Sequence, residues 1–184
     1  TADDGTEGVD LWGICYSIEN TNSIFLTGPE IEGTIPPLIG NLVNLTSLEI
    51  NWTGIHGNIP PEIVNLTNLT TLSLTGNYLS GEIPPELGNL TNLTTLSLSD
   101  NGLSGSIPSE LGNLINLTNL NFFDTELSGG IPPELGNLVN LNSLELHNNN
   151  LEGSIPSEIG NLISLTNLHL ANNYLEGDVP LGIW

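Results

Sequence analysis

The chain has 184 residues, 38% of them hydrophobic, and carries 21 acidic residues but no lysine or arginine, giving a formal net charge of −21 at pH 7. This length and hydrophobic content favour one elongated domain with a continuous core, and no apolar run reaches the roughly 20 residues that a membrane span requires. The charge opposes binding to nucleic acid and to anionic lipid headgroups, because both need cationic partners.

Residues 1–22 are expected to form an N-terminal tail and cap. Residues 1–8 are polar and acidic, whereas residues 9–16 (VDLWGICY) are apolar enough to cover the open end of a core. Cys15 is the only cysteine, which excludes an internal disulfide. It is either a small buried hydrophobic residue or one half of an intermolecular bond.

Residues 23–184 repeat with a period of 24. An Ile-Pro pair recurs from Ile35 and Pro36 to Ile155 and Pro156, and Val179 with Pro180 ends the series. A fixed period of this length predicts a solenoid.

Each repeat contains two apolar residues that bracket one polar or outward residue, which is the alternation of a short strand with one buried face. The pairs are Ile24/Leu26, Leu48/Ile50, Leu72/Leu74, Leu96/Leu98, Leu120/Phe122, Leu144/Leu146 and Leu168/Leu170. They predict a parallel sheet of about seven strands, one per repeat.

A second apolar register has a spacing of three and follows Pro-Pro or Pro-Ser. Its pairs are Leu42/Leu45, Leu66/Leu69, Leu90/Leu93, Leu114/Leu117, Leu138/Leu141 and Leu162/Leu165. Proline starts a helical turn well and continues it badly, so one short helical turn is expected on the opposite, convex side. The predicted fold class is therefore an α/β solenoid dominated by β-structure.

Two asparagine ladders recur with the same period. The first is Asn77, Asn101, Asn149 and Asn173, with Thr53 and Thr125 in equivalent places; the second is Asn41, Asn65, Asn89, Asn113, Asn137 and Asn161. Because an amide both donates and accepts hydrogen bonds, we expect both ladders to be buried and to satisfy backbone groups of the next coil.

The unit LxxLxxLxLxxNxLxGxIPxxLGNL, nearly verbatim in residues 66–90, resembles the plant-type leucine-rich repeat. The resemblance implies a right-handed curved solenoid with its strands on the concave face. The repeat unit is similar to those of secreted microbial leucine-rich repeat arrays, of plant receptor-kinase ectodomains and of polygalacturonase-inhibiting proteins. Residues 12–15 (WGIC) resemble the end of the W-x-G-V-x-C cap of those proteins, one residue shorter and without its partner cysteine.

The outward residues of the predicted strands are mostly Ser, Thr and Asn, with few aromatic side chains to anchor a ligand. The binding candidates on this face are Phe25, Glu49, Trp52, Phe123, Asp124, His147 and His169. Glu145, His147 and His169 should cluster on adjacent coils, either as a zinc-type metal site or as part of a solvated polar face. With no nucleophile elbow, glycine-rich phosphate loop or HExxH motif, we expect neither an enzyme nor a cofactor.

The convex side carries one glutamate per coil: Glu62, Glu86, Glu110, Glu134 and Glu158. These carboxylates either satisfy the first helical turn or form a weak Ca²⁺ ladder. Asn44, Asn68, Asn92 and Asn116 are glycosylation candidates, whereas Asn65 and Asn89 are poor acceptors if their ladder is buried.

The main functional expectation is a non-enzymatic extracellular or cell-surface protein that assembles end to end into a filament or surface layer. The apolar candidates for that contact are Leu11, Trp12, Ile14 and Tyr16 at one end and Leu181, Ile183 and Trp184 at the other. Contact between two different surfaces propagates unless it closes a ring. The alternatives are a module that binds a protein or carbohydrate on the concave face and an ice or mineral binder using Thr46, Thr70, Thr94, Thr118 and Thr166.

Overall fold

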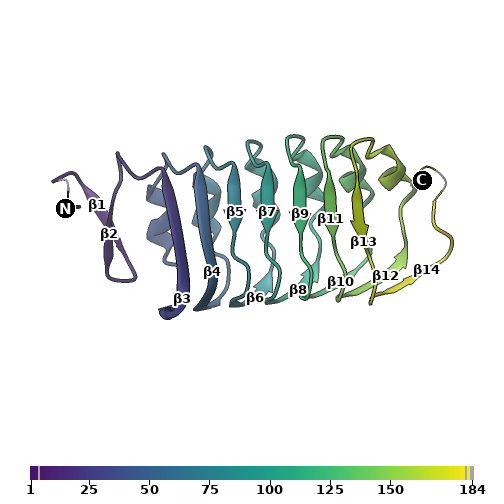
Figure 1. Ribbon diagram of the computed structural model, residues 1–184, viewed down its shortest axis with the longest axis horizontal. Coiled ribbons are helices and arrows are strands. Elements are labelled where there is room, and N and C mark those ends of the chain that lie inside the picture. Colours follow the sequence, from purple (N-terminus) through teal and green to yellow (C-terminus); the bar gives the residue numbers. More distant parts are fainter. Residues whose placement is uncertain (4, 181, 183–184) are drawn as a thin grey trace.

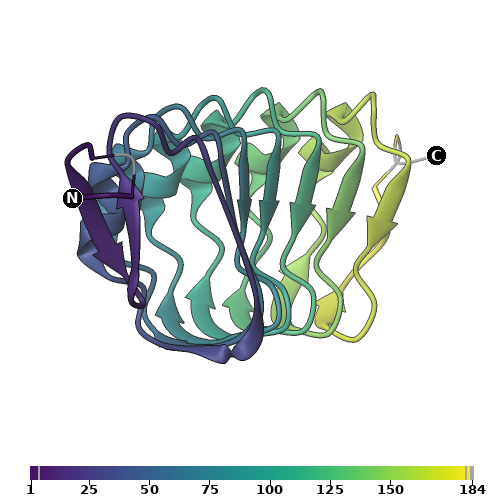
Figure 2. The same cartoon turned by 60° about the vertical axis from the view of Figure 1, so that its left-hand side comes forward.

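The computed structural model describes residues 1–3, 5–180 and 182, and it shows a stack of coils with three sides each (Figures 1 and 2). One side is a parallel sheet, the second is a row of short helical turns, and the third is another ladder of parallel strands. None of the helices in the described part of the chain is long and apolar enough to cross a membrane.

The first sheet confirms the predicted strands. Its seven strands in the described residues are β3 (Ser23–Gly33), β4 (Ser47–Gly57), β5 (Thr71–Ser73), β7 (Thr95–Ser97), β9 (Asn119–Asn121), β11 (Ser143–Glu145) and β13 (Asn167–His169). They pair in parallel with a register of 24, so that Leu72 lies beside Leu48 and Leu96. This register keeps the leucines buried and the residues between them outward, because a slip by one residue would turn every leucine outward.

The second side consists of 3-10 turns. These are η1 (Pro37–Asn41), η2 (Pro61–Asn65), η3 (Pro85–Asn89), η4 (Ser109–Asn113), η5 (Pro133–Asn137) and η6 (Ser157–Asn161). In η3 the N-cap Pro84 has an extended backbone (φ −61°, ψ 123°), and the turn ends where the Leu90 N–H donates to the Leu87 carbonyl at 3.0 Å. The predicted helical turns are confirmed in place, and they are 3-10 turns.

The third side was not predicted. Its strands are β6 (Tyr78–Glu82), β8 (Gly102–Ser106), β10 (Glu126–Gly129), β12 (Asn150–Ser154) and β14 (Tyr174–Glu176), and they continue the parallel pairing from the end of β4. In β6 only Leu79 is buried, so the alternation that marks a strand is missing.

The N-terminal segment forms an antiparallel hairpin of β1 (Gly8–Leu11) and β2 (Ile14–Ser17). Val9 and Leu11 are buried and belong to the same hydrophobic core as the repeats, so the hairpin covers that end of the stack. Cys15 is free and half-buried.

The first asparagine ladder links the coils; Asn77, Asn101 and Asn149 are buried, and Asn173 in the last coil is half-buried. Asn101 shows the pattern: its Oδ1 accepts from the N–H of Leu79 at 3.0 Å, and its Nδ2 donates to the carbonyls of Leu74 and Leu98, each at 2.9 Å. The second ladder was predicted wrongly, because Asn65, Asn89 and their equivalents are exposed at the ends of the 3-10 turns.

Candidate functional site

The outward side of β3, β4, β5, β7, β9, β11 and β13 is called the strand face below. Phe25 and Trp52 lie at its N-terminal end and are 67% and 61% exposed. Glu49 lies on β4, four coils from Glu145 on β11, or about 19 Å at a strand spacing of about 4.8 Å. The structure therefore separates Phe25, Glu49 and Trp52 from the remaining candidates.

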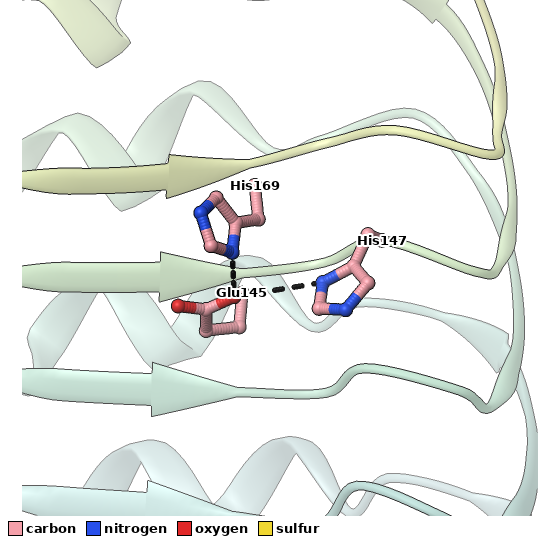
Figure 3. A group of neighbouring side chains, drawn as sticks. All are labelled: Glu145, His147 and His169. Atoms are coloured by element: carbon pink, nitrogen blue, oxygen red, sulfur yellow. Dashed lines mark ion pairs between the residues drawn. The ribbon is translucent and has the colours of Figure 1, made fainter.

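At the C-terminal end, Glu145, His147 and His169 lie together, as the sequence predicted (Figure 3). The Oε2 of Glu145 lies 2.6 Å from the Nδ1 of His169 and 3.5 Å from the Nδ1 of His147. One ligand atom from each side chain falls within 4.8 Å of the others. The parallel register causes this proximity, since β11 and β13 place Glu145 beside His169.

Aromatic contacts fix this cluster from the side. The ring of Phe123 stacks on His147 with centroids 4.6 Å apart and planes 14° apart, and His147 meets His169 edge to face at 5.6 Å. Together Phe123, Glu145, His147 and His169 form the histidine cluster.

Two carboxylates beside this cluster occupy a strained backbone position. Asp100 and Asp124 have φ values of 54° and 52°, in the left-handed region, at the point where the chain leaves the strand face. Asp124 was a sequence candidate, but Asp100 was missed. The 24-residue spacing of the two aspartates was the available signal. The Asp124 N–H donates to the carbonyl of His147 at 3.1 Å, so this pair adjoins the histidine cluster.

The surroundings of Asp100 disfavour its charged form. Burial raises the pKa of Asp100, and the negative charge of Asp124 raises it further. A hydrogen bond from Ser99 and the charge of His147 act in the opposite direction. Ionisation of Asp100 is therefore energetically unfavourable, and a bound cation would reduce that free-energy cost.

A shallow groove of about 530 Å³ runs along this edge. Asp100, Asp124 and Glu126 supply its carboxylates, and Tyr78 supplies an aromatic side chain that is 72% exposed. We call it the acidic groove. Neither Glu126 nor Tyr78 was a sequence candidate, because both belong to the unpredicted third side of the coil.

The convex glutamates follow the stacking of the 3-10 turns. The backbone and Cβ of Glu110 pack over Gly88 of the preceding coil, so closely that a Cβ added at Gly88 would lie 2.3 Å from the Glu110 carbonyl oxygen. Nothing in this arrangement bears on Ca²⁺, which stays a prediction.

The glycosylation candidates are exposed, and each donates its amide to a carbonyl of the preceding coil. The Nδ2 of Asn68 bonds the Val43 carbonyl at 2.9 Å, and Asn44, Asn92 and Asn116 do the same with Glu19, Thr67 and Thr91. These asparagines thus form a coil-linking ladder that the sequence analysis did not recognise.

The candidates for end-to-end contact are only partly available. Leu11 is fully buried in the core, so its assignment to an exposed patch was wrong. Ile14 is 41% exposed, and the Nε1 of Trp12 donates to the carbonyl of Thr34 at 3.1 Å, while Tyr16 is half-buried. The opposite candidates, Leu181, Ile183 and Trp184, lie outside the described residues.

Comparison with known proteins places this geometry in a family. Residues 26–128 match the model described as a leucine-rich repeat region, and residues 140–162 and 164–184 match the leucine-rich repeat model. Comparison with curated proteins gave no significant match.

Solved structures match over most of the chain. One is the ectodomain of the membrane receptor kinase GASSHO1/SCHENGEN3 from Arabidopsis thaliana in complex with CASPARIAN STRIP INTEGRITY FACTOR 2 (TM-score 0.84, 44% identity, 86% of this chain and 19% of that one). Another is a pollen receptor kinase 3 (0.78, 31%, 96% and 83%). A plant ice-binding protein also matches (0.61, 26%, 88% and 67%).

The chain spans only about a fifth of the GASSHO1/SCHENGEN3 chain, so the match concerns the repeats. The two family models together cover most of residues 26–184, the part of the chain that carries the 24-residue period and the parallel strand face. The chain therefore belongs to the leucine-rich repeat family, with repeats of the plant type.

Proposed function

We propose that this chain is a non-catalytic extracellular binding module that recognises a cationic segment of a peptide or protein at the edge where the strand face meets the third side of the coils. The observation that carries the proposal is the acidic groove, which lies directly beside the stacked rings of Phe123 and His147. The half-buried rings of Phe123 and His147 and the exposed ring of Tyr78 offer an apolar anchor, and the carboxylates beside them offer charge complementarity to a cationic ligand.

The charge of the chain supports a basic partner. With 21 acidic residues and no lysine or arginine, the chain has no Lys or Arg side chain to neutralise the groove. A lysine or arginine from a partner would therefore find Asp100, Asp124 and Glu126 without a Lys or Arg competitor from the chain itself. Such a field also speeds encounter with a cationic ligand.

The neighbours support a protein partner and an extracellular setting. The GASSHO1/SCHENGEN3 structure is the ectodomain of a membrane receptor kinase in complex with a factor. A further neighbour, with a TM-score of 0.80 and 40% identity, is described as a plant peptide hormone receptor, RGFR1, in complex with RGF2.

Selection from a library of random 12-residue peptides tests the proposal. We expect the recovered peptides to be rich in arginine and lysine and to bind the chain with lysine or arginine in the acidic groove. A triple variant, D100N/D124N/E126Q, should weaken their binding at least tenfold. The matched control, E86Q/E110Q/E134Q, removes the same charge from the convex side and should weaken it less than twofold.

Equal losses in both variants would mean that the peptides respond to net charge alone, and recovery of acidic or neutral peptides would contradict the proposed partner. Both variants are to be compared at the same ionic strength, because the long-range part of the attraction is screened within about 8 Å at physiological salt.

End-to-end assembly into a filament or surface layer stays a prediction. In the described residues its N-terminal patch is reduced to Trp12, Ile14 and Tyr16, of which Ile14 is the most exposed. Electron microscopy and sedimentation at high protein and salt concentration would test it, and a monodisperse monomer under those conditions would exclude it.

Ice binding is a weaker alternative, supported by the likeness to the ice-binding protein and by the threonine row. The hydroxyls of Thr46, Thr70 and Thr94 each donate to a backbone carbonyl of the preceding coil at 2.9–3.0 Å. These hydrogen bonds link successive coils, so the threonine row is explained without ice binding. Thermal hysteresis that is lost in Thr70→Val and Thr94→Val would favour this alternative over peptide binding.

A further inference from the structure

We propose that Glu145, His147 and His169 bind one divalent metal ion of the zinc class on the strand face. Two imidazoles and one carboxylate suit borderline ions such as Zn²⁺, Ni²⁺ and Cu²⁺, whereas Ca²⁺ and Mg²⁺ prefer sites made of oxygen alone. Among the residues that the structure describes, this is the group of three His, Cys, Asp or Glu side chains whose ligand atoms come this close.

The distances are close to those of a loaded site. The three ligand atoms lie within 4.8 Å of one another, whereas ligands around a tetrahedral zinc ion with bonds of 2.0–2.1 Å lie roughly 3.3 Å apart. A rotation of the His169 side chain would have to open its 2.6 Å contact with Glu145 and shorten the wider separations. His169 has room for it, since its side chain is 60% exposed, compared with 27% for His147 and 19% for Glu145.

Two of the ligands are already held in place by neighbours. The hydroxyl of Ser143 donates to the Oε1 of Glu145 at 2.9 Å, which orients the carboxylate with Oε2 toward the histidines. Phe123 stacks on the ring of His147 and limits its rotation. Such supporting contacts fix the direction of metal ligands and reduce the entropy lost when the ion binds.

One nitrogen in the cluster lacks a hydrogen bond. The Nδ1 of His147 is buried, and within the described part of the chain it makes no hydrogen bond, although the Oε2 of Glu145 lies 3.5 Å away. A buried polar atom without a partner is costly, and a metal ion between His147, Glu145 and His169 would satisfy it.

The ligands come from two successive coils. Glu145 belongs to β11 and His147 follows it, whereas His169 belongs to β13, and the two strands pair through the register that sets Glu145 beside His169. An ion held by both coils would cross-link them and would stabilise the folded chain by mass action. Because His169 is exposed, a fourth coordination position would face the solvent on the strand face, where water or a partner's side chain could occupy it. The inference does not depend on the proposed peptide binding.

Calorimetric titration of the untagged chain with ZnCl₂, in the presence of 5 mM CaCl₂ to occupy non-specific acidic sites, tests the proposal. We expect one zinc ion per chain. His169→Ala and Glu145→Gln should each lower the affinity at least tenfold, and Ser143→Ala should lower it by about tenfold through the loss of orientation. His56→Ala is the matched control and should leave binding unchanged, because His56 bonds the carbonyl of Gly33 far from the cluster.

NMR of the three histidine side chains measures zinc binding in the unaltered protein, so the test does not depend on variants that could fail to fold. Zinc should shift the ring signals of His147 and His169 and leave those of His56 in place. Equal shifts of all three rings, zinc uptake that calcium abolishes, or undiminished uptake in the double variant H147A/H169A would overturn the proposal.

Discussion

The ring of Phe123 stacks on His147 at 4.6 Å, while the neighbouring Phe122 is fully buried in the core. The two phenylalanines are consecutive in sequence, and the strand alternation sends one to the strand face and the other inward. Comparing a substitution at Phe122 with one at Phe123 therefore tests which residue lies on which face of the sheet.

We expect Phe122→Ala to lower the free energy of unfolding by about 3–5 kcal/mol, because it leaves a cavity among leucines. Phe123→Ala should lower it by less than about 1 kcal/mol, yet it should weaken zinc binding by freeing the ring of His147. Urea unfolding and zinc titration measure both quantities. Equal stability losses would mean that the assigned register is wrong.

The buried asparagine ladder makes a second prediction. Asn101→Ala removes the partners of the Leu79 N–H and of the Leu74 and Leu98 carbonyls, so we expect a loss of at least about 2 kcal/mol in urea unfolding. Asn113→Ala is the control, since Asn113 is exposed at the end of η4 and should change stability by less than about 0.5 kcal/mol. If the two variants unfold at the same urea concentration, the ladder does not stabilise the stack.

Two glycines on different sides of the coil make another prediction. A Cβ at Gly112 would lie 2.5 Å from the carbonyl oxygen of Glu134, whereas a Cβ at Gly130 would meet its nearest atom at 3.9 Å. We expect Gly112→Ala to cost about 1–3 kcal/mol and Gly130→Ala to be neutral or slightly stabilising. Thermal unfolding compares them. Val64 holds the position in η2 that is equivalent to Gly112, and η2 and η3 are accordingly less closely packed. We therefore expect the turns around Gly112→Ala to move slightly apart while the chain stays folded.

Much of the fold could be predicted because the 24-residue repeat presents the same leucines at the same places. The strand pairs such as Leu72 and Leu74 alternate strictly, and their burial follows from that pattern. The histidine cluster could be predicted for the same reason, since outward residues at equivalent positions of adjacent coils must be neighbours. The third side could not be predicted, because β6 and its equivalents are held by backbone pairing and bury at most one leucine each.

Repetition also misled. The positions of Asn65 and Asn101 both recur every 24 residues, but Asn101 lies where backbone groups of neighbouring coils converge, whereas Asn65 is exposed at the end of η2. Asp100 was missed although it lies 24 residues before Asp124, at the equivalent left-handed position just beyond the strand face. Regular spacing shows that a position is structurally equivalent in every coil, but it does not show which contacts that position makes.

The pair Asp100 and Asp124 makes the last prediction. Because the pKa of Asp100 is raised in the folded chain, folded Asp100 holds its proton more tightly than unfolded Asp100 does, and its ionisation reduces stability as the pH rises through the folded-state pKa. Asp100→Asn removes that ionisation. Asparagine also tolerates the left-handed backbone, as Asn148 and Asn172 do at the equivalent positions with φ values of 57° and 56°.

We therefore expect Asp100→Asn to raise the melting temperature at pH 7 and to lose this advantage near about pH 3, where both proteins carry a neutral side chain. Part of the gain comes from Asp124 and should shrink in high salt, while the part caused by burial should persist. In the double variant D100N/D124N the two gains should be less than additive, because each substitution alone already removes the repulsion between the carboxylates. A gain that is the same at pH 3 and pH 7 would mean that the ionisation of Asp100 does not destabilise the fold.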